Sequence, residues 1–191
     1  MITLNDLTVK QVMNIKNITV EDDVTKALEI VSIVYDCNAE DISINEFQSK
    51  LKDIDLSKPV DRPKVKKSYV INGTKYILDK SLNISTAQYV DYTNYMKEGN
   101  LVKILSVFLI PEGHKYNDGY DIFNVMKDME EMSYPTATSI GFFFLRLLKI
   151  YIKLFLPFLI RKLKKTNPII AKQVKDQITI LLNNLESCLT F

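Results

Sequence analysis

The chain has 191 residues, of which 47% are hydrophobic and 25% charged, with only five Gly and six Pro. This length suits one large domain or two small ones, and the ordinary composition excludes a wholly disordered or fibrous chain. His114 is the only histidine, which excludes multi-histidine metal sites and triads based on a second histidine. Cys37 and Cys188 form no CxxC motif, and we expect two buried thiols in a reducing compartment.

Charge is unevenly placed along the chain. The formal net charge is +2, but residues 141–191 carry nine Lys and Arg side chains against Asp176 and Glu186. The first residues, MITLNDLTVKQ, lack the basic start, apolar run and small-residue cleavage site of a secretory signal. We therefore expect a protein that remains in the cytoplasm, with a basic C-terminal part.

Apolar spacing predicts three helices in the first third of the chain. They cover residues 7–18, 21–35 and about 43–54. Glu21, Asp22 and Asp23 suit the positive end of the second helix, and Ser43 with Glu46 is a capping-box pattern at the start of the third.

The composition then changes to DIDLSKPVDRPKVKK, which indicates a linker over residues 56–67. A β-hairpin follows at about residues 68–78, because Asn72-Gly73 joins two runs rich in β-branched and aromatic residues. The predicted division is an N-terminal helical unit (1–55), this linker, and a β-hairpin plus helical domain (68–191).

Capping and proline signals predict the remaining helices. Ser85 with Gln88 is a second capping-box pattern, and Asp121 is a candidate N-cap. These signals predict helices over about residues 85–97, over 101–110 with its end at Pro111, and over 122–132. A long helix begins at Ser133 to Pro135 and bends at Pro157, and a last amphipathic helix begins at Asn167-Pro168. The predicted fold class is mainly α, a multi-helix bundle with one β-hairpin and a long, Pro-bent C-terminal helix.

Two pairs of short segments resemble each other within the chain. LTVKQ, from Leu7, resembles ISTAQ, from Ile84, and EIVSIV at 29–34 resembles KILSVF at 103–108. The separations are 77 and 74 residues. Either apolar helices match by chance here, or the chain contains two related helical units.

Residues 141–165, GFFFLRLLKIYIKLFLPFLIRKLKK, form the most apolar stretch. Arg146, Lys149 and Lys153 interrupt it, and each would cost about 2.5–3.5 kcal/mol at a bilayer centre, so a spanning helix is excluded. Apolar side chains wrap most of the helix, which leaves three interpretations: the core of the chain's own fold, an interface with another chain, or attachment to a membrane surface. The candidate partner-binding residues are Phe142, Phe143, Phe144, Arg146, Lys149, Tyr151, Lys153 and Phe155.

Other charged segments give weaker signals. The run at 161–165 lacks interleaved aromatic residues, so a solvated helix end is favoured over nucleic-acid binding. The acidic residues from Asp118 to Glu131 do not follow the ligand pattern of an EF-hand, and paired catalytic carboxylates there are the minor alternative. We expect no catalytic residue, no metal, no cofactor and no enzymatic activity.

Several segments resemble proteins of bacteriophage tail-morphogenesis modules, in particular tail assembly chaperone-like proteins of Bacteroidetes phages. The resembling segments are YILDKSLNISTAQYVDY, ILSVFLIPEGHKYNDGYD and TATSIGFFFLRLLKIYIK. The resemblance implies a helical, cofactor-free accessory of tail or virion assembly in the cytoplasm of an infected bacterium. Retention of the protein in the virion is an alternative. Its implied partners are phage structural or tape-measure-like proteins, with a homo-oligomer as another option. A peripheral membrane protein that uses residues 141–165 is the competing hypothesis.

Overall fold

The computed structural model describes residues 1–78 and 84–189 of the chain. In the last two helices it leaves out the side chains of residues 148–149, 151–156, 159, 166, 181–182 and 184–189. The described residues form a mainly α-helical fold with a small antiparallel sheet, which confirms the predicted fold class.

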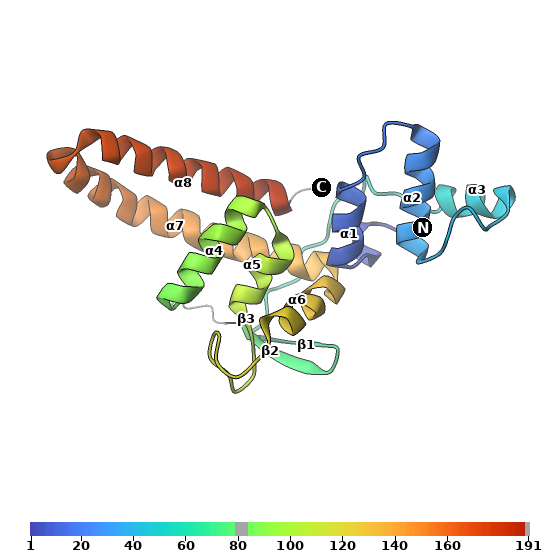
Figure 1. Ribbon diagram of the computed structural model, residues 1–191, viewed down its shortest axis with the longest axis horizontal. Coiled ribbons are helices and arrows are strands. Elements are labelled where there is room, and N and C mark those ends of the chain that lie inside the picture. Colours follow the sequence, from blue (N-terminus) through green and yellow to red (C-terminus); the bar gives the residue numbers. More distant parts are fainter. Residues whose placement is uncertain (79–83, 190–191) are drawn as a thin grey trace.

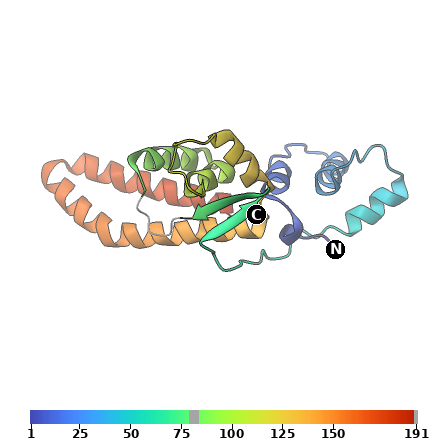
Figure 2. The ribbon, with the colours of Figure 1, turned by 90° about the horizontal axis from the view of Figure 1, so that it is seen from below.

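The molecule is elongated. Helices α7 (Tyr134–Thr166) and α8 (Pro168–Leu189) form a long antiparallel hairpin that projects from one end (Figure 1). Helices α2 (Asp23–Tyr35) and α3 (Ile44–Lys52) lie at the opposite end. The other elements lie between these two ends, and Figure 2 shows the same order from below.

The chain begins with a 3₁₀ turn (η1, Leu4–Asp6) followed by helix α1 (Val9–Lys16). The sequence predicts one helix from residue 7, but Thr8 lies in extended backbone and caps α1. Its hydroxyl accepts the backbone N–H of Gln11, and the Gln11 side chain accepts the N–H of Thr8. This capping box ends the preceding turn and fixes where α1 starts.

The sheet is larger than the predicted hairpin. Strands β1 (Ser68–Ile71) and β2 (Thr74–Leu78) are joined through Asn72 and Gly73, both at positive φ, as the Asn-Gly signal predicts. A third strand, β3 (Leu109–Pro111), pairs antiparallel with β2. The predicted end of the helix over 101–110 is therefore wrong, because Leu109 and Ile110 belong to β3.

Proline explains that difference. Helix α5 (Leu101–Phe108) stops before Leu109 because a residue that precedes proline, here Ile110, is driven out of the helical region by the proline ring. Extended backbone then places these residues beside β2. Pro111 itself lies at the end of the strand, where its missing N–H breaks no ladder.

The remaining helices begin at their predicted caps. Helix α4 (Thr86–Glu98) starts with the complete capping box of Ser85 and Gln88, and α6 (Ile122–Glu131) starts at Asp121, which accepts the N–H of Phe123 at 2.9 Å. Helix α7 continues through Pro157 without a break, and it curves along its length in Figure 2.

One hydrophobic cluster joins the two halves of the sequence. It takes side chains from η1, α1 and α2, from the sheet, and from α4 to α7. Its most deeply buried members include Val9, Val12, Tyr76, Met96, Ile104, Leu105, Leu109, Met129 and Ile140. The predicted division of the chain at residues 56–67 stays a prediction.

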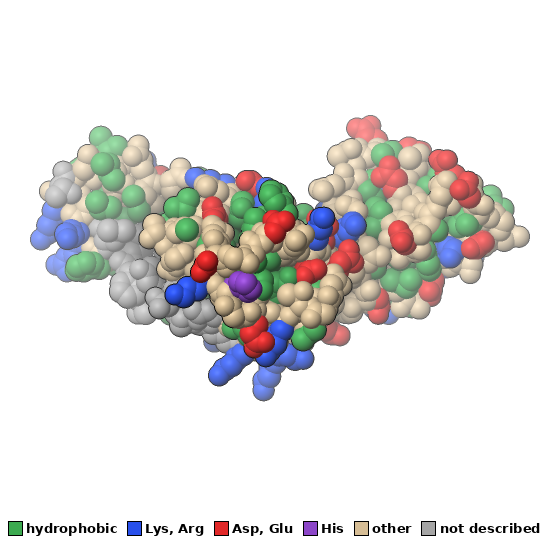
Figure 3. All heavy atoms as spheres, turned by 60° about the horizontal axis from the view of Figure 1, so that its bottom comes forward, with side chains coloured by type: hydrophobic (Ala, Val, Ile, Leu, Met, Phe, Trp, Pro, Cys, Tyr) green, Lys and Arg blue, Asp and Glu red, His purple; other side chains and the backbone are tan. Residues whose placement is uncertain are grey.

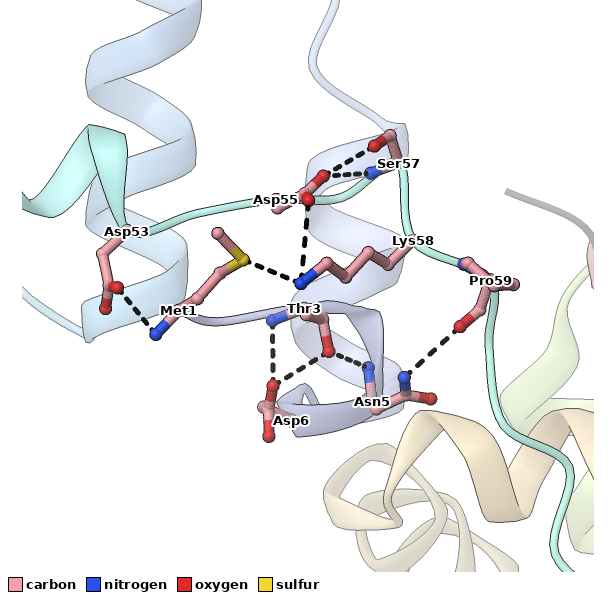
Figure 4. A network of polar contacts seen from close by, with 9 residues as sticks. All are labelled: Met1, Thr3, Asn5, Asp6, Asp53, Asp55, Ser57, Lys58 and Pro59. Atoms are coloured by element: carbon pink, nitrogen blue, oxygen red, sulfur yellow. Dashed lines mark hydrogen bonds and ion pairs between the residues drawn. The ribbon is translucent and has the colours of Figure 1, made fainter.

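Residues 56–67 contain no helix or strand, and their first part is held against the N-terminus (Figure 4). Ile2 forms a parallel bridge with Ile54, and the amino group of Met1 lies 2.7 Å from an Asp53 carboxylate oxygen. Asn5 donates its side-chain amide to the Pro59 carbonyl at 3.3 Å. These backbone and side-chain contacts hold the start of the segment against the N-terminal residues.

The two resembling segment pairs have equivalent structures. Gln11 and Gln88 are both the third residue of a helix, and each closes a capping box. The Gln11 amide donates to the Ile33 carbonyl at 3.1 Å, and the Gln88 amide donates to the Val107 carbonyl at 3.0 Å. Ile33 and Val107 are 74 residues apart, the separation of the second segment pair. The pairs α1–α2 and α4–α5 thus share a capping box and a glutamine-to-carbonyl hydrogen bond, and a common origin of the two units stays a prediction.

Candidate interaction surfaces

The predicted partner-binding aromatic residues lie at the start of α7, against the core. Phe144 is 3% exposed, and its ring stacks on that of Phe108 with the centroids 3.7 Å apart. Phe142 and Phe143 are partly buried and pack on the same cluster. These three side chains therefore contribute mainly to the chain's own fold, and their assignment to a partner stays a prediction.

A basic side chain from the predicted linker covers part of this region. The Arg62 guanidinium lies 3.7 Å from the centroid of the Phe142 ring, within the range of a cation–π contact. Arg146 is exposed. The other predicted site residues lie outside the described side chains: Lys149, Tyr151, Lys153 and Phe155.

The far end of the α7–α8 hairpin carries the two most exposed large apolar side chains described in these two helices. We call residues 157–170 the hairpin tip. Phe158 is 71% exposed and Ile169 is 69% exposed, and Ile170 is also exposed. Large side chains that stay in water at the end of a projecting hairpin indicate a contact surface.

Cations surround these apolar side chains. Residues 157–175 contain six Lys and Arg residues and no Asp or Glu. Figure 3 shows Lys and Arg side chains gathered at this end of the molecule. The exposed cations of the tip are Arg161, Lys162, Lys164 and Lys165.

Local sequence explains why the hairpin turns at this point. Asn167 lies in extended backbone, and its side-chain oxygen accepts the N–H groups of Ile169 and Ile170 at 3.1 and 3.2 Å. Pro168 occupies the first position of α8, where its missing N–H is not needed. Ala171, which is buried, has a side chain small enough to let the two helices approach closely. Asn167, Pro168 and Ala171 together keep the end of α7 close to the start of α8.

The sequence pattern predicts a solvated helix end for residues 161–165. It does not indicate that Phe158, Ile169 or Ile170 belongs to a contact surface. The sequence signal that could have revealed the tip is Asn167-Pro168. This pair ends one helix and starts the next, so residues on both sides of it lie at one end of the hairpin. Spacing along a single helix does not reveal that arrangement.

The opposite end of the molecule has the opposite charge. Residues 21–53 carry nine Asp and Glu residues against three Lys residues. Figure 3 shows acidic side chains spread over this end. Ile44 is 72% exposed there, and Val24 is exposed as well. Both ends thus combine exposed apolar side chains with charge of a single dominant sign.

The acidic residues proposed as a catalytic alternative have structural contacts. Asp128 accepts hydrogen bonds from the Tyr76 hydroxyl and the Asn72 side chain, and Asp121 caps α6. Burial, followed by the hydrogen bond to Asp128, raises the pKa of Tyr76 well above its usual range. Among the described residues, no group of three or more His, Cys, Asp and Glu side chains is arranged to hold a metal ion.

The described helices are not suited to cross a membrane. Within residues 1–78 and 84–189, every helix is too short or too polar to span a lipid bilayer.

Comparison with known proteins does not assign the chain to a family. No protein-family model, no curated protein and no solved structure matches the chain.

Proposed function

We propose that this chain is a non-enzymatic assembly protein that binds other protein chains, with tail or virion morphogenesis of a bacteriophage as its setting. The observation that carries the proposal is the pair of exposed apolar surfaces at opposite ends of an elongated molecule. A protein that joins other chains needs separate contact surfaces, and exposed apolar side chains at both ends of the molecule support such a role. The resemblance of three segments to tail-module proteins supports the phage setting.

The hairpin tip is suited to a helical partner with an acidic surface. Burial of a large apolar side chain contributes about 1.5–3 kcal/mol, so Phe158, Ile169 and Ile170 together supply enough free energy for a specific contact. The surrounding cations would speed association with an acidic partner and exclude a basic one. The projecting hairpin also allows the tip to reach a groove between partner helices.

A lipid surface is the second candidate partner. The tip places exposed apolar side chains beside four cations without a carboxylate, which is the composition of segments that bind anionic membranes. A membrane would engage one end of the molecule only. The exposed Val24 and Ile44 at the acidic end have no role in that mode, and this favours protein partners.

Co-purification tests the proposal. The full chain is expressed together with the products of the neighbouring genes, and captured through an affinity tag, as the wild type and as the variant Phe158→Ser with Ile169→Ser. We expect the wild type to retain at least one morphogenesis protein and the tip variant to lose most of it. Phe123→Ser is the matched control, because Phe123 is 70% exposed but lies on α6, away from the tip.

Vesicle flotation separates the two candidates. Vesicles of phosphatidylcholine with phosphatidylserine are mixed with the purified full chain at low and at physiological salt. Salt-sensitive flotation that the tip variant loses, together with no captured protein, would replace the proposed function with membrane attachment. Retention of a protein partner without flotation is the expected result.

A further inference from the structure

The two helix pairs α1–α2 and α4–α5 differ in how well they are covered. Helix α5 packs against α4, α6 and α7, and its residues Val102, Ser106 and Val107 are buried. The equivalent residues of α2, 74 positions earlier, are Leu28, Ser32 and Ile33, and all three are only partly buried. Helix α2 has α1 and α3 as its main neighbours. The equivalent positions are thus buried in α5 and more accessible in α2.

A groove follows this open face. It has a volume of about 560 Å³ and runs between the C-terminal end of α1, α2 and the loop after α2. Leu28 and Ile33 provide apolar surface, and Glu29 and Glu40 provide negative charge. Its lining residues are Asn14, Asn17, Thr25, Leu28, Glu29, Ser32, Ile33, Asn38 and Glu40.

The charge of the groove defines the kind of ligand it fits. No Lys or Arg is among the lining residues. In the part of the chain that the structure describes, neither the Glu29 nor the Glu40 carboxylate forms an ion pair. Glu29 is partly buried, so its charge is less well solvated than at an open surface. A ligand that brings both apolar side chains and cations would satisfy this groove.

We propose that the groove between α1 and α2 receives the hairpin tip of a second copy of this chain. The tip supplies the required chemistry, with Phe158 and Ile169 for the apolar surface and Lys162 and Lys165 for the two carboxylates. Its two helices would cover α2 as α6 and α7 cover α5. The proposal rests on the proposed function, because it names a second copy as one of the protein partners.

The geometry of the molecule makes this contact intermolecular and open-ended. The tip and α2 lie at opposite ends, so a chain cannot bring its own tip to its own groove (Figure 1). Two different surfaces meet, so each added copy leaves one free tip and one free groove. Such a heterologous contact produces a row or ring of copies instead of a two-fold dimer.

Sedimentation velocity of the purified full chain tests the arrangement. The wild type is expected to form species larger than a dimer as its concentration rises to about 0.1 mM, within the range of a micromolar contact. Salt should weaken assembly at least tenfold, because an increase from about 0.15 M to about 1 M shortens the screening length from about 8 Å to about 3 Å.

Two charge-reversal variants define the surfaces. The groove variant carries Glu29→Lys and Glu40→Lys, and the tip variant carries Lys162→Glu and Lys165→Glu. Each alone should be monomeric, because its tip and groove carry charge of the same sign. An equimolar mixture should assemble again, because native tips meet native grooves and reversed tips meet reversed grooves of opposite charge. Lys97→Glu with Lys127→Glu, exposed and away from both surfaces, is the control and should assemble like the wild type.

A variant that combines all four reversals restores opposite charges and should assemble again. This rescue separates loss of contact from loss of folding. A wild type that stays monomeric, a groove variant that still assembles alone, or a mixture that stays monomeric would overturn the inference. Capture of a morphogenesis protein by a monomeric wild type would leave the proposed function standing and reject only self-association.

Discussion

The ring of Phe144 stacks on the ring of Phe108, with the centroids 3.7 Å apart and the planes inclined by 19°. Phe108 is the last residue of α5, and Phe144 lies in the third turn of α7. The contact joins the long hairpin to the central helices. Its side chains are nearly inaccessible to water, so this part of the Phe-rich segment belongs to the core.

Replacement of Phe144 should therefore be costly. We expect Phe144→Ala to lower the free energy of unfolding by about 3–5 kcal/mol, because a buried ring is lost and a cavity remains. Phe158→Ala should change it by about 0.5 kcal/mol or less, since that ring is exposed. Urea denaturation of both variants checks the difference. Equal effects would show that the two rings have similar environments, against this structure.

The two capping-box glutamines should differ in energetic weight. Gln88 is buried, so Gln88→Ala leaves the Val107 carbonyl without its donor in the core and should cost about 1–3 kcal/mol. Gln11 is only partly buried, and water can replace its amide, so Gln11→Ala should cost about 0.5–1.5 kcal/mol. Thermal unfolding of both variants gives the order, and a larger loss for Gln11→Ala would contradict it.

Two buried tyrosines should respond oppositely to removal of the hydroxyl. Tyr76 donates to Asp128, so Tyr76→Phe loses a hydrogen bond to a carboxylate and should cost about 1.5–3 kcal/mol. The Tyr92 hydroxyl is buried and has no hydrogen-bond partner among the described residues, so Tyr92→Phe should leave stability unchanged or raise it by about 1 kcal/mol. Chemical denaturation measures both. Strong destabilisation by Tyr92→Phe would mean that this hydroxyl has a partner.

Alkaline pH should destabilise the fold. Burial, followed by a hydrogen bond to Asp91, raises the pKa of Tyr116, and burial followed by the bond to Asp128 raises that of Tyr76. Above about pH 10 these tyrosines ionise in the unfolded chain but stay protonated in the folded one, so the unfolded state binds fewer protons. The free energy of unfolding should then fall with rising pH.

Tyr116→Phe removes one of these groups and should flatten that decline. Denaturation curves measured between about pH 8 and pH 11 give the slope for the wild type and for the variant. A wild-type stability that is constant or rises over this interval would contradict the expected direction.

Local signals predicted the helix starts and the hairpin, because a cap or an Asn-Gly turn acts through neighbouring residues. Ser43, Ser85 and Asp121 show this at three helices. Strand β3 was missed because its pairing with β2 is a long-range contact. The burial of Phe144 was left open for the same reason, since it depends on Phe108, 36 positions earlier in the sequence.

The hairpin tip was missed because no single helix contains it. Phe158 precedes the turn, and Ile169 follows it, and only the packing of α7 on α8 brings them to one end. The groove on α2 also depends on an arrangement in space. The internal sequence similarity nevertheless aligns α2 with α5. In that alignment the buried residues of α5 correspond to residues of α2 that are only partly buried.

Hydrogen–deuterium exchange of the full chain, alone and in complex with a co-purified morphogenesis protein, tests the central claim most directly. We predict that amide exchange slows over residues 157–170 in the complex, while α6 around Phe123 exchanges as in the free chain. Unchanged exchange at the tip, with protection confined to other segments, would contradict the assignment of the tip as the partner-binding surface.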